Sequence, residues 1–550
     1  MTRNRWIAVA MVVAAIGVGV WMAPRWAIYV PGMLSDWRNP IGPNQPVPWS
    51  AGPAAPAQDP RPPNIVLILA DDLGWNDISF YGGGVAGGSV PTPHIDAIAE
   101  GGAHFLNGYA AHGTCAPSRA ALMSGRYGTR FGFEFTPTPD GMPTIVGMLH
   151  NANAANIHPI HRVADAGDDE LAFEEKGMPA DEVTLAELLA AQGYHTMHVG
   201  KWHLGHNSGS GPEDQGFAES LNMASGMYLP EDHPEAVNAR VPFDPIDQFL
   251  WASLRHAVNW NGGPRFEPDG YLTDYFTEQA VTAIEKNRHR PFFLYLAHWA
   301  PHTPLQALRA DYDALAHIED HRLRVYAAMI RSLDRGVGRV TDTLRRLGLE
   351  DNTLVIFTSD NGGAGYIGLP DVNQPYRGWK ITFFEGGIRV PYFLKWPARI
   401  APGSVLEAPV HHFDLYATAA AAAGAGLPDD RVMDGVNLLP YVSGDVAAPQ
   451  RPLFWRSGHY QVVLAGGWKL QRSDRPERVW LHHVAEDPTE QRDLAAEFPE
   501  KVAELAALLD AHNADQAAPL WASRAEFPVL IDKPLGVEQL PTDEYVYVPN

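Results

Sequence analysis

The chain has 550 residues, of which 45% are hydrophobic and 19% are charged, and this composition excludes a disordered or collagen-like chain. Its 41 basic and 64 acidic residues give a formal net charge of −23, and no basic run suits a phosphate backbone, so we expect no nucleic-acid partner. The single cysteine, Cys115, excludes an intrachain disulfide and a thiolate zinc or iron–sulfur site.

The N-terminal segment has the pattern of an export signal. Arg3 and Arg5 precede an uncharged, mostly apolar stretch at residues 6–24, and Arg25 follows it. This length fits both the apolar core of a signal peptide and a short membrane-spanning helix, and both alternatives stay open. We therefore expect residues 1–38 to be a signal peptide or a membrane anchor. In either case the rest of the chain is exported, to the periplasm or the extracellular space.

Residues 39–63 contain 9 prolines in 25 residues, which predicts a stiff, extended linker. Beyond it, short apolar runs alternate with amphipathic stretches. Strands are expected at 64–70, 195–199, 291–297 and 353–358, and helices at 184–193, around 276–284 and over 325–344. This alternation predicts an α/β fold over residues 64–450, with a doubly wound, mostly parallel sheet covered by helices on both faces.

The pattern changes at about residue 451. Short strands are expected at 462–464, 468–471 and 479–482, followed by a helix that carries apolar residues from Val502 to Leu509. We interpret residues 451–550 as a smaller C-terminal α+β subdomain with a tail.

Two acidic pairs follow predicted strands. Asp71 and Asp72 come directly after the strand at 64–70, and Asp360 and Asn361 follow the strand at 353–358. Each pair alone is typical of a solvated turn. Because the carboxyl ends of parallel strands meet at one edge of a sheet, the four side chains together predict an oxygen-ligand site for a hard divalent cation, Ca²⁺ or Mg²⁺.

Cys115 opens the segment Cys115-Ala-Pro-Ser-Arg119. Pro117 suits the first turn of a helix, so we expect the cysteine at a helix N-terminus, which favours anions and lowers the pKa of a thiol. The alternative is an ordinary buried cysteine. Arg119, one turn further on, favours a site that handles anions.

These segments together resemble the type I sulfatases, the formylglycine-dependent, arylsulfatase-like branch of the alkaline phosphatase superfamily. The resemblance covers residues 64–510 in motif order. Besides Asn64–Asp72 and Cys115–Arg119 with Ser124-Gly125-Arg126, the matching segments are Gly200-Lys-Trp-His-Leu-Gly205, Pro301-His-Thr-Pro304, Ser359–Gly362, Arg377-Gly-Trp-Lys380 leading to Glu385–Pro391, and a tail from Trp468 to Leu494.

The resemblance implies a specific nucleophile. Cys115 is then oxidised to formylglycine by a formylglycine-generating enzyme, and one hydroxyl of the aldehyde hydrate attacks sulfur with help from the cation and Asp360. The implied cation ligands, for Ca²⁺ in the first place and Mg²⁺ as the alternative, are Asp71, Asp72, Cys115, Asp360 and Asn361.

The resemblance also implies roles for five further residues. Arg119, Lys201 and Lys380 offset charge on the sulfuryl oxygens. His302, alone or with Lys380, protonates the leaving oxygen, and His203 takes a proton from the second hydroxyl so that sulfate leaves.

The alternatives without a catalytic role are solvated surface lysines for Lys201 and Lys380, and core histidines for His203 and His302. We expect a structural role for the other histidines considered, with His206 the one nearest to substrate: His112, His206, His411, His412, His482 and His483.

Three functions compete. A sulfate-ester hydrolase ranks first, a formylglycine-dependent phosphonate monoester or phosphodiester hydrolase second, and a non-catalytic binding protein third, since no expected ligand is missing. Residues 150–181 and 207–266 match no motif and are expected to be irregular loops that shape the pocket. Because the segment at 216–221 departs from the family, aryl sulfates, sulfated glycans and sulfated glycolipids all stay open as substrates.

Overall fold

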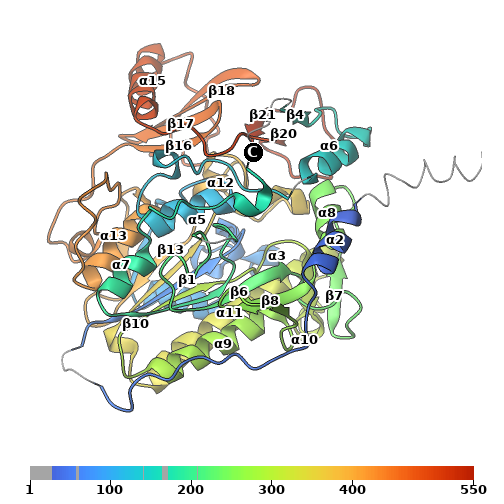
Figure 1. Ribbon diagram of the computed structural model, residues 1–550. Coiled ribbons are helices and arrows are strands. Elements are labelled where there is room, and N and C mark those ends of the chain that lie inside the picture. The colour runs from blue at the N-terminus through green and yellow to red at the C-terminus, as the bar shows by residue number, and fades with distance from the viewer. Residues whose placement is uncertain (1–27, 57–60, 140, 164–170, 207–208) are drawn as a thin grey trace, which may run out of the picture.

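The structure, a computed structural model, describes residues 28–56, 61–139, 141–163, 171–206 and 209–550 (Figure 1). The predicted signal or anchor at residues 6–24 lies outside the described residues. Within the described ranges, no helix combines the length and the apolarity needed to cross a membrane.

A mixed, mostly parallel sheet forms the centre of the molecule. Strand β1 (Asn64–Ala70) is fully buried and lies between β10 (Phe292–Ala297) and β12 (Thr353–Ser359), parallel to both. Across the described residues the strand order is β14 (Ser404–Leu406), β2 (Ala103–Phe105), β13 (Tyr392–Lys395), β12, β1, β10, β5 (His195–Gly200), β6 (Glu219–Gly226), β8 (His256–Trp260) and β9 (Arg265–Phe266). In this order the strands from β12 to β6 are all parallel, and the antiparallel pairs of the described sheet lie beyond these two strands on either side. The predicted doubly wound, mostly parallel sheet is therefore confirmed.

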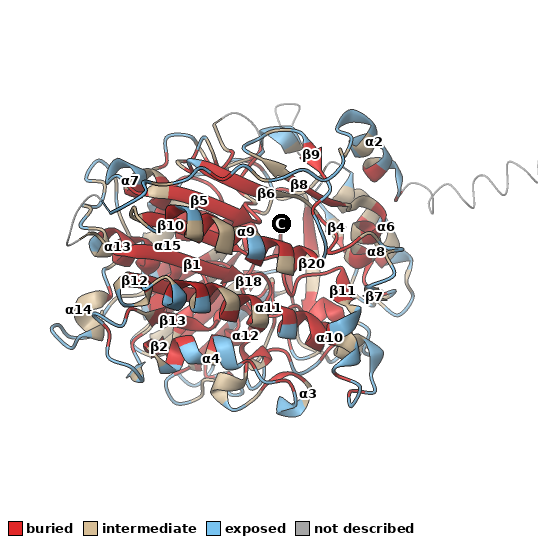
Figure 2. Ribbon diagram, turned by 90° about the horizontal axis from the view of Figure 1, so that it is seen from below, coloured by how far each residue is buried: buried red, intermediate tan, exposed pale blue. Residues whose placement is uncertain are grey.

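Helices cover both faces of this sheet. Alternate side chains of β1 point to opposite faces, and all of them are buried. Val66 and Ile68 pack into one core cluster, whereas Ile65 and Leu67 pack into the other. The first cluster takes in α4 (Pro93–Glu100), α9 (Leu272–Asn287) and α11 (His321–Arg346), and the second takes in α5 (Cys115–Ser124), α7 (Leu185–Ala191) and α13 (His412–Ala422). Figure 2 shows the sheet buried and the outer faces of these helices exposed.

The C-terminal part carries the predicted smaller α+β unit. An antiparallel sheet of β16 (Leu453–Ser457), β17 (Tyr460–Ala465), β18 (Trp468–Asp474) and β19 (Glu477–His483) packs against α15 (Pro499–Ala514). The shorter elements of the described chain are α2 (Val30–Arg38), α3 (Val85–Gly88), α6 (Met142–Ala152), α8 (Pro245–Ser253), α10 (Arg309–Asp313), α12 (Glu385–Ile388), α14 (Leu439–Val442), β3 (Gly108–Tyr109), β4 (His161–Arg162), β7 (Ala236–Ala239), β11 (Leu305–Leu308), β15 (Val410–His411), β20 (Ala525–Leu530) and β21 (Tyr545–Pro549).

The prediction of an irregular loop over residues 207–266 is wrong. This segment supplies β6, β8 and β9, which extend the central sheet, and also β7 and α8. Strand β6 has the sequence ESLNMASG, which contains no β-branched residue and several residues that strands avoid, so its pattern does not signal a strand. Neighbouring strands, rather than local propensity, determine its conformation.

The proline-rich segment runs along the body of the protein rather than away from it, as the dark blue trace near α9 shows (Figure 1). Trp49 is buried, and its indole nitrogen donates a hydrogen bond to Gln279 of α9 at 2.9 Å. Lys286 of the same helix donates to the carbonyl oxygen of Trp49 at 2.7 Å. The described part of this segment is therefore docked on the α/β domain.

Candidate functional site

The two acidic pairs meet at the carboxyl edge of the central sheet. Because β1 and β12 are parallel with Ala70 opposite Ser359, the residues after each strand emerge side by side. Asp71 and Asp360 are fully buried, and the backbone N–H of Asp72 donates to Oδ1 of Asp360 at 3.2 Å. The solvated-turn alternative is excluded for both pairs by this burial.

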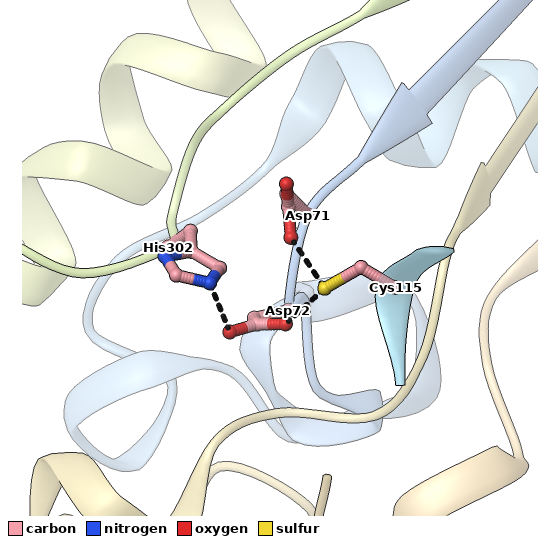
Figure 3. A group of neighbouring side chains, drawn as sticks. All are labelled: Asp71, Asp72, Cys115 and His302. Atoms are coloured by element: carbon pink, nitrogen blue, oxygen red, sulfur yellow. Dashed lines mark hydrogen bonds and ion pairs between the residues drawn. The ribbon is translucent and has the colours of Figure 1, made fainter. Parts of the chain in front are cut away.

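Cys115 begins helix α5 and faces the same carboxylates (Figure 3). Its Sγ lies 3.4 Å from Oδ1 of Asp71 and 3.8 Å from Oδ1 of Asp72. Burial, together with the negative charges of Asp360 and Asp71, raises the pKa of the thiol well above its ordinary value. The expectation of a lowered thiol pKa is therefore wrong, because burial and the two carboxylates raise it more than Lys201 and Lys380 lower it.

Three buried cations pair with the carboxylates. Arg119 bridges Asp71 and Asp360, with Nη2 at 3.1 Å and 2.8 Å from their Oδ2 atoms. Lys201 Nζ lies 2.6 Å from Asp71, and Lys380 Nζ lies 2.6 Å from Asp72. The lysines are 4% and 6% exposed, which excludes the surface-lysine alternative.

The two predicted catalytic histidines lie beside this cluster. His302 Nε2 is 3.5 Å from Oδ2 of Asp72, its Nδ1 is 2.6 Å from the carbonyl oxygen of Thr303, and its ring stacks on Trp299. His203 interacts electrostatically with Lys201, and its buried Nδ1 has no hydrogen-bond partner among the described residues. Burial lowers the pKa of both rings well below the ordinary value, so both are neutral at neutral pH in this arrangement.

The donor set fits a divalent cation. Asn361 donates through Nδ2 to Oδ1 of Asp72 at 2.8 Å, but its own Oδ1 is buried and has no hydrogen-bond partner in the described chain. A buried amide oxygen without a donor is rare unless a ligand completes it. Ligand atoms of Asp71, Asp72, Cys115 and His302 also lie within 4.8 Å of one another. Carboxylate and amide oxygens are the ligands that Ca²⁺ and Mg²⁺ prefer.

One residue of the cluster is missed by the motifs. Tyr366 donates a hydrogen bond to Oδ2 of Asp72 at 2.8 Å, and Lys380 Nζ donates to its hydroxyl oxygen at 3.1 Å. Its signal was its position, since it follows Asp360-Asn361 in a glycine-rich loop at the same sheet edge.

The histidines expected to be structural behave differently from one another. His412 lies between Ser118 and Thr358, 3.2 Å from each hydroxyl, which is a core role. His112 Nε2 lies 3.0 Å from the carbonyl oxygen of Arg456. His206 is exposed and interacts electrostatically with His203, so it lies near the site.

Comparisons with known proteins agree with this geometry. The sequence profile of the Sulfatase family matches residues 63–425. The chain is 34% identical over 409 residues to N-acetylgalactosamine-6-sulfatase from Homo sapiens, covering 72% of this chain and 69% of the relative. It is 32% identical over 464 residues to steryl-sulfatase from Mus musculus, covering 72% and 67%.

Solved structures share the fold of this chain. Ps i-CgsB, crystallised in complex with k-i-k-neocarrahexaose, is 30% identical and superposes with a TM-score of 0.69 over 84% of this chain and 95% of that one. A phosphonate monoester hydrolase from Silicibacter pomeroyi shares the fold at 17% identity, with a TM-score of 0.56 over 83% and 96%. The chain therefore belongs to the sulfatase family of the alkaline phosphatase superfamily, and it is a sulfate-ester hydrolase.

Proposed function

We propose that this sulfatase uses a formylglycine hydrate derived from Cys115 as its nucleophile, together with a divalent cation, Ca²⁺ in the first place. The observation that carries the proposal is the position of Cys115, whose Sγ contacts Asp71 and Asp72 at the buried edge of the sheet. Because burial and carboxylates raise the pKa of the thiol, an unmodified cysteine is a poor nucleophile there. Oxidation to an aldehyde gives the same position a different chemistry.

The hydrated aldehyde supplies two hydroxyls on one carbon, one to attack sulfur and one whose deprotonation expels sulfate, and a divalent cation supplies positive charge next to them. Asp71, Asp72, Asp360 and Asn361 would hold the cation. The unpaired Oδ1 of Asn361 and the carboxylates that Lys201 and Lys380 now neutralise support this assignment.

The chain's own cations are suited to an anionic sulfuryl group. Arg119 is fixed by Asp71 and Asp360 and by a hydrogen bond from Nη1 to the carbonyl oxygen of Lys201. Its guanidinium group therefore supplies a positive charge in a fixed position. The ammonium group of Lys201 pairs with Asp71, and that of Lys380 pairs with Asp72. Each can turn from its carboxylate to the substrate oxygens. In a dry site such charges stabilise the transition state strongly.

Two ring nitrogens are suited to the proton transfers. If Nδ1 of His302 donates to the carbonyl oxygen of Thr303, its Nε2 is left facing the site, and we assign this atom to the leaving oxygen, with Lys380 beside it as a second donor. An anionic sulfuryl group nearby raises the pKa of this imidazole toward the protonated form. The unpaired Nδ1 of His203 is the atom we assign to the second hydroxyl.

We propose a sulfated glycan or another small sulfated molecule as substrate, with the formylglycine-generating enzyme as a partner during maturation. N-acetylgalactosamine-6-sulfatase and the k-i-k-neocarrahexaose complex of Ps i-CgsB support a sulfated saccharide. We also propose export to the periplasm or the extracellular space, on the pattern at residues 6–24. The phosphonate hydrolase shares only the fold at its level of identity.

The test is peptide mass spectrometry across Cys115 on protein from a host that makes formylglycine. We expect the mass of an aldehyde at this position and turnover of sulfate esters, with phosphonate esters hydrolysed more slowly. Protein from a host without the converting enzyme is the matched control and should retain the thiol. A plain thiol in active protein from the competent host would overturn the proposed nucleophile.

A further inference from the structure

Helix α2 (Val30–Arg38) carries an exposed apolar face. Val30, Met33, Leu34 and Trp37 are 47%, 61%, 46% and 80% exposed. Their spacing of i, i+3, i+4 and i+7 places all four on one side of the helix, within an arc of ~100°. We call these four residues the α2 face. A soluble domain seldom exposes so many large apolar side chains side by side.

The opposite side of α2 is docked on the catalytic domain. Gly32 is buried, and a Cβ at this position would lie 2.9 Å from the carbonyl oxygen of Ala252 and 3.0 Å from Cα of Ser253 in α8. Asp36 accepts a hydrogen bond from Nε of Arg255 at 2.8 Å. These contacts hold α2 in one orientation, and the α2 face therefore points away from the body of the protein, at the outer edge next to α8 (Figure 1).

The sequence that precedes α2 supports a lipid surface as the occupant of this face. The uncharged apolar stretch at residues 6–24 ends five residues before α2 begins, and Arg25 stands between them. As a membrane anchor, one of the two alternatives that its sequence leaves open, this segment lies in the lipid bilayer. A helix that begins five residues after such an anchor would lie at the bilayer surface, where apolar and aromatic side chains are favoured on an interfacial helix.

Charge and size argue against other occupants. The net charge of −23 opposes electrostatic attraction to anionic lipid, so contact has to come from the apolar side chains. Four side chains on a nine-residue helix are also far fewer than the 20–30 residues a side of a stable protein–protein interface. We propose that the α2 face lies in the interface of a lipid bilayer and holds the catalytic domain against the membrane in a fixed orientation.

The experiment uses the full chain reconstituted in phosphatidylcholine vesicles. A nitroxide is attached at Met33→Cys in a Cys115→Ser background, which leaves one reactive cysteine, and its accessibility to oxygen is compared with that to a water-soluble nickel chelate. The matched control is Val446→Cys, an apolar position of comparable exposure (53%) that follows α14, and Figure 2 shows α14 on the opposite side of the molecule from α2. We expect a severalfold lower nickel accessibility and a higher oxygen accessibility at position 33.

A second variant separates the α2 face from the apolar stretch that precedes it. In Leu34→Gln with Trp37→Gln, the label at position 33 should become as accessible to nickel as the control label, while residues 6–24 are unchanged and the double variant in a native Cys115 background hydrolyses sulfate esters at the original rate. Equal nickel accessibility at positions 33 and 446 in the parent chain would overturn the proposal. Shielding that persists in the double variant, or spin–spin broadening between copies, would overturn it as well.

Discussion

Two clusters of buried charge in this protein look alike in composition and differ in how completely they are satisfied. The first is the strand-end cluster, built from Asp71, Asp72 and Asp360 with Arg119, Lys201 and Lys380. The second, which we call the subdomain cluster, joins β18 of the C-terminal unit to α12 of the catalytic domain. Lys469 Nζ lies 2.8 Å from Glu385 and 3.0 Å from Glu490, and all three side chains are fully buried.

In the subdomain cluster every carboxylate oxygen has a donor. Glu385 accepts from Lys469 through one oxygen and from Tyr109 and Arg389 through the other. Glu490 accepts from Lys469 and Gln471 through one oxygen and from the backbone N–H of Glu385 through the other. This arrangement is complete without any added group, as a structural ion-pair network requires.

The strand-end cluster is incomplete by the same test. The amide oxygen of Asn361 and Nδ1 of His203 are buried without partners in the described chain, and a thiol contacts two carboxylates. The ring of His482, near Glu490, also has unpaired nitrogens, so an orphaned atom alone identifies no site. What distinguishes the strand-end cluster is that the unpaired oxygen of Asn361 lies among carboxylate oxygens that could bind the same cation, next to Cys115, the residue proposed to become formylglycine.

The largest expected effect comes from Cys115→Ser. Serine keeps a hydrogen-bonding group next to Asp71 but gives no aldehyde in a host whose converting enzyme acts on cysteine, and its sulfate ester has no second hydroxyl to expel sulfate. We expect kcat for sulfate-ester hydrolysis to fall by roughly 10³-fold or more, with thermal unfolding almost unchanged. Steady-state kinetics together with calorimetry checks this. A variant that keeps a tenth of the activity would contradict the assigned nucleophile.

Lys469→Met should lower stability and leave activity unchanged. It removes the cation that Glu385 and Glu490 share and leaves these two carboxylates facing each other. Breaking a buried pair in this way costs ~3–5 kcal/mol of unfolding free energy. The control is Lys501→Met, which removes an exposed pair with Glu504 and should cost ~0–1 kcal/mol. Urea unfolding measures both. At temperatures where Lys469→Met is folded, its KM and kcat should match those of the parent, and a large loss of kcat would mean that the two clusters are coupled.

The contrast between the clusters also shows what sequence reasoning reaches. The buried strands at 64–70 and 353–358 are predictable because both faces are apolar, and the acidic pairs after them lie where parallel topology requires. Strand β6 is not predictable, because its extended conformation depends on pairing with β5 and β8 and not on its own sequence. The same holds within the site. Motifs identify which residues gather, but the raised thiol pKa of Cys115 and the role of Tyr366 depend on burial and contacts that no spacing encodes.

Metal removal should destabilise the protein through the strand-end cluster and not through the subdomain cluster. The expected loss of stability is intermediate in size. A chelator should lower the unfolding temperature and the activity of the parent, and a cation present at about 100 times its Kd contributes ~3 kcal/mol that is lost. In Asn361→Ala, which lacks the orphaned amide oxygen, we expect a smaller chelator-induced shift. Lys469→Met should show the full shift, because its cluster contains no metal ligand. Differential scanning fluorimetry with added Ca²⁺ or Mg²⁺ checks this, and an Asn361→Ala variant with an undiminished shift would remove Asn361 from the ligand set.

The smallest effect is a pH dependence confined to the subdomain cluster. Burial raises the pKa of Glu490 to about 7; Lys469 lowers it and the charge of Glu385 raises it, but burial is the largest of these causes. A folded-state pKa above the ordinary value of 4.5 means that the folded protein holds more protons than the unfolded chain between these limits. The stabilisation is therefore fully present below about pH 4.5 and is lost as the pH rises through 7, with a slope of at most ~1.4 kcal/mol per pH unit.

Glu490→Gln removes this titration and with it the slope, although the amide loses one accepted hydrogen bond, so its absolute stability is also lower. Urea unfolding of parent and variant at pH 5 and pH 7.5 compares the two slopes. Any slope shared by both proteins comes from other groups, among them the strand-end carboxylates, and only the difference reports on Glu490. If the two slopes are equal, Glu490 is ionised in the folded protein across this range. Glu385 and Glu490 would then both be charged against the single cation Lys469, and the donors to their four oxygens would have to stabilise the remaining buried negative charge.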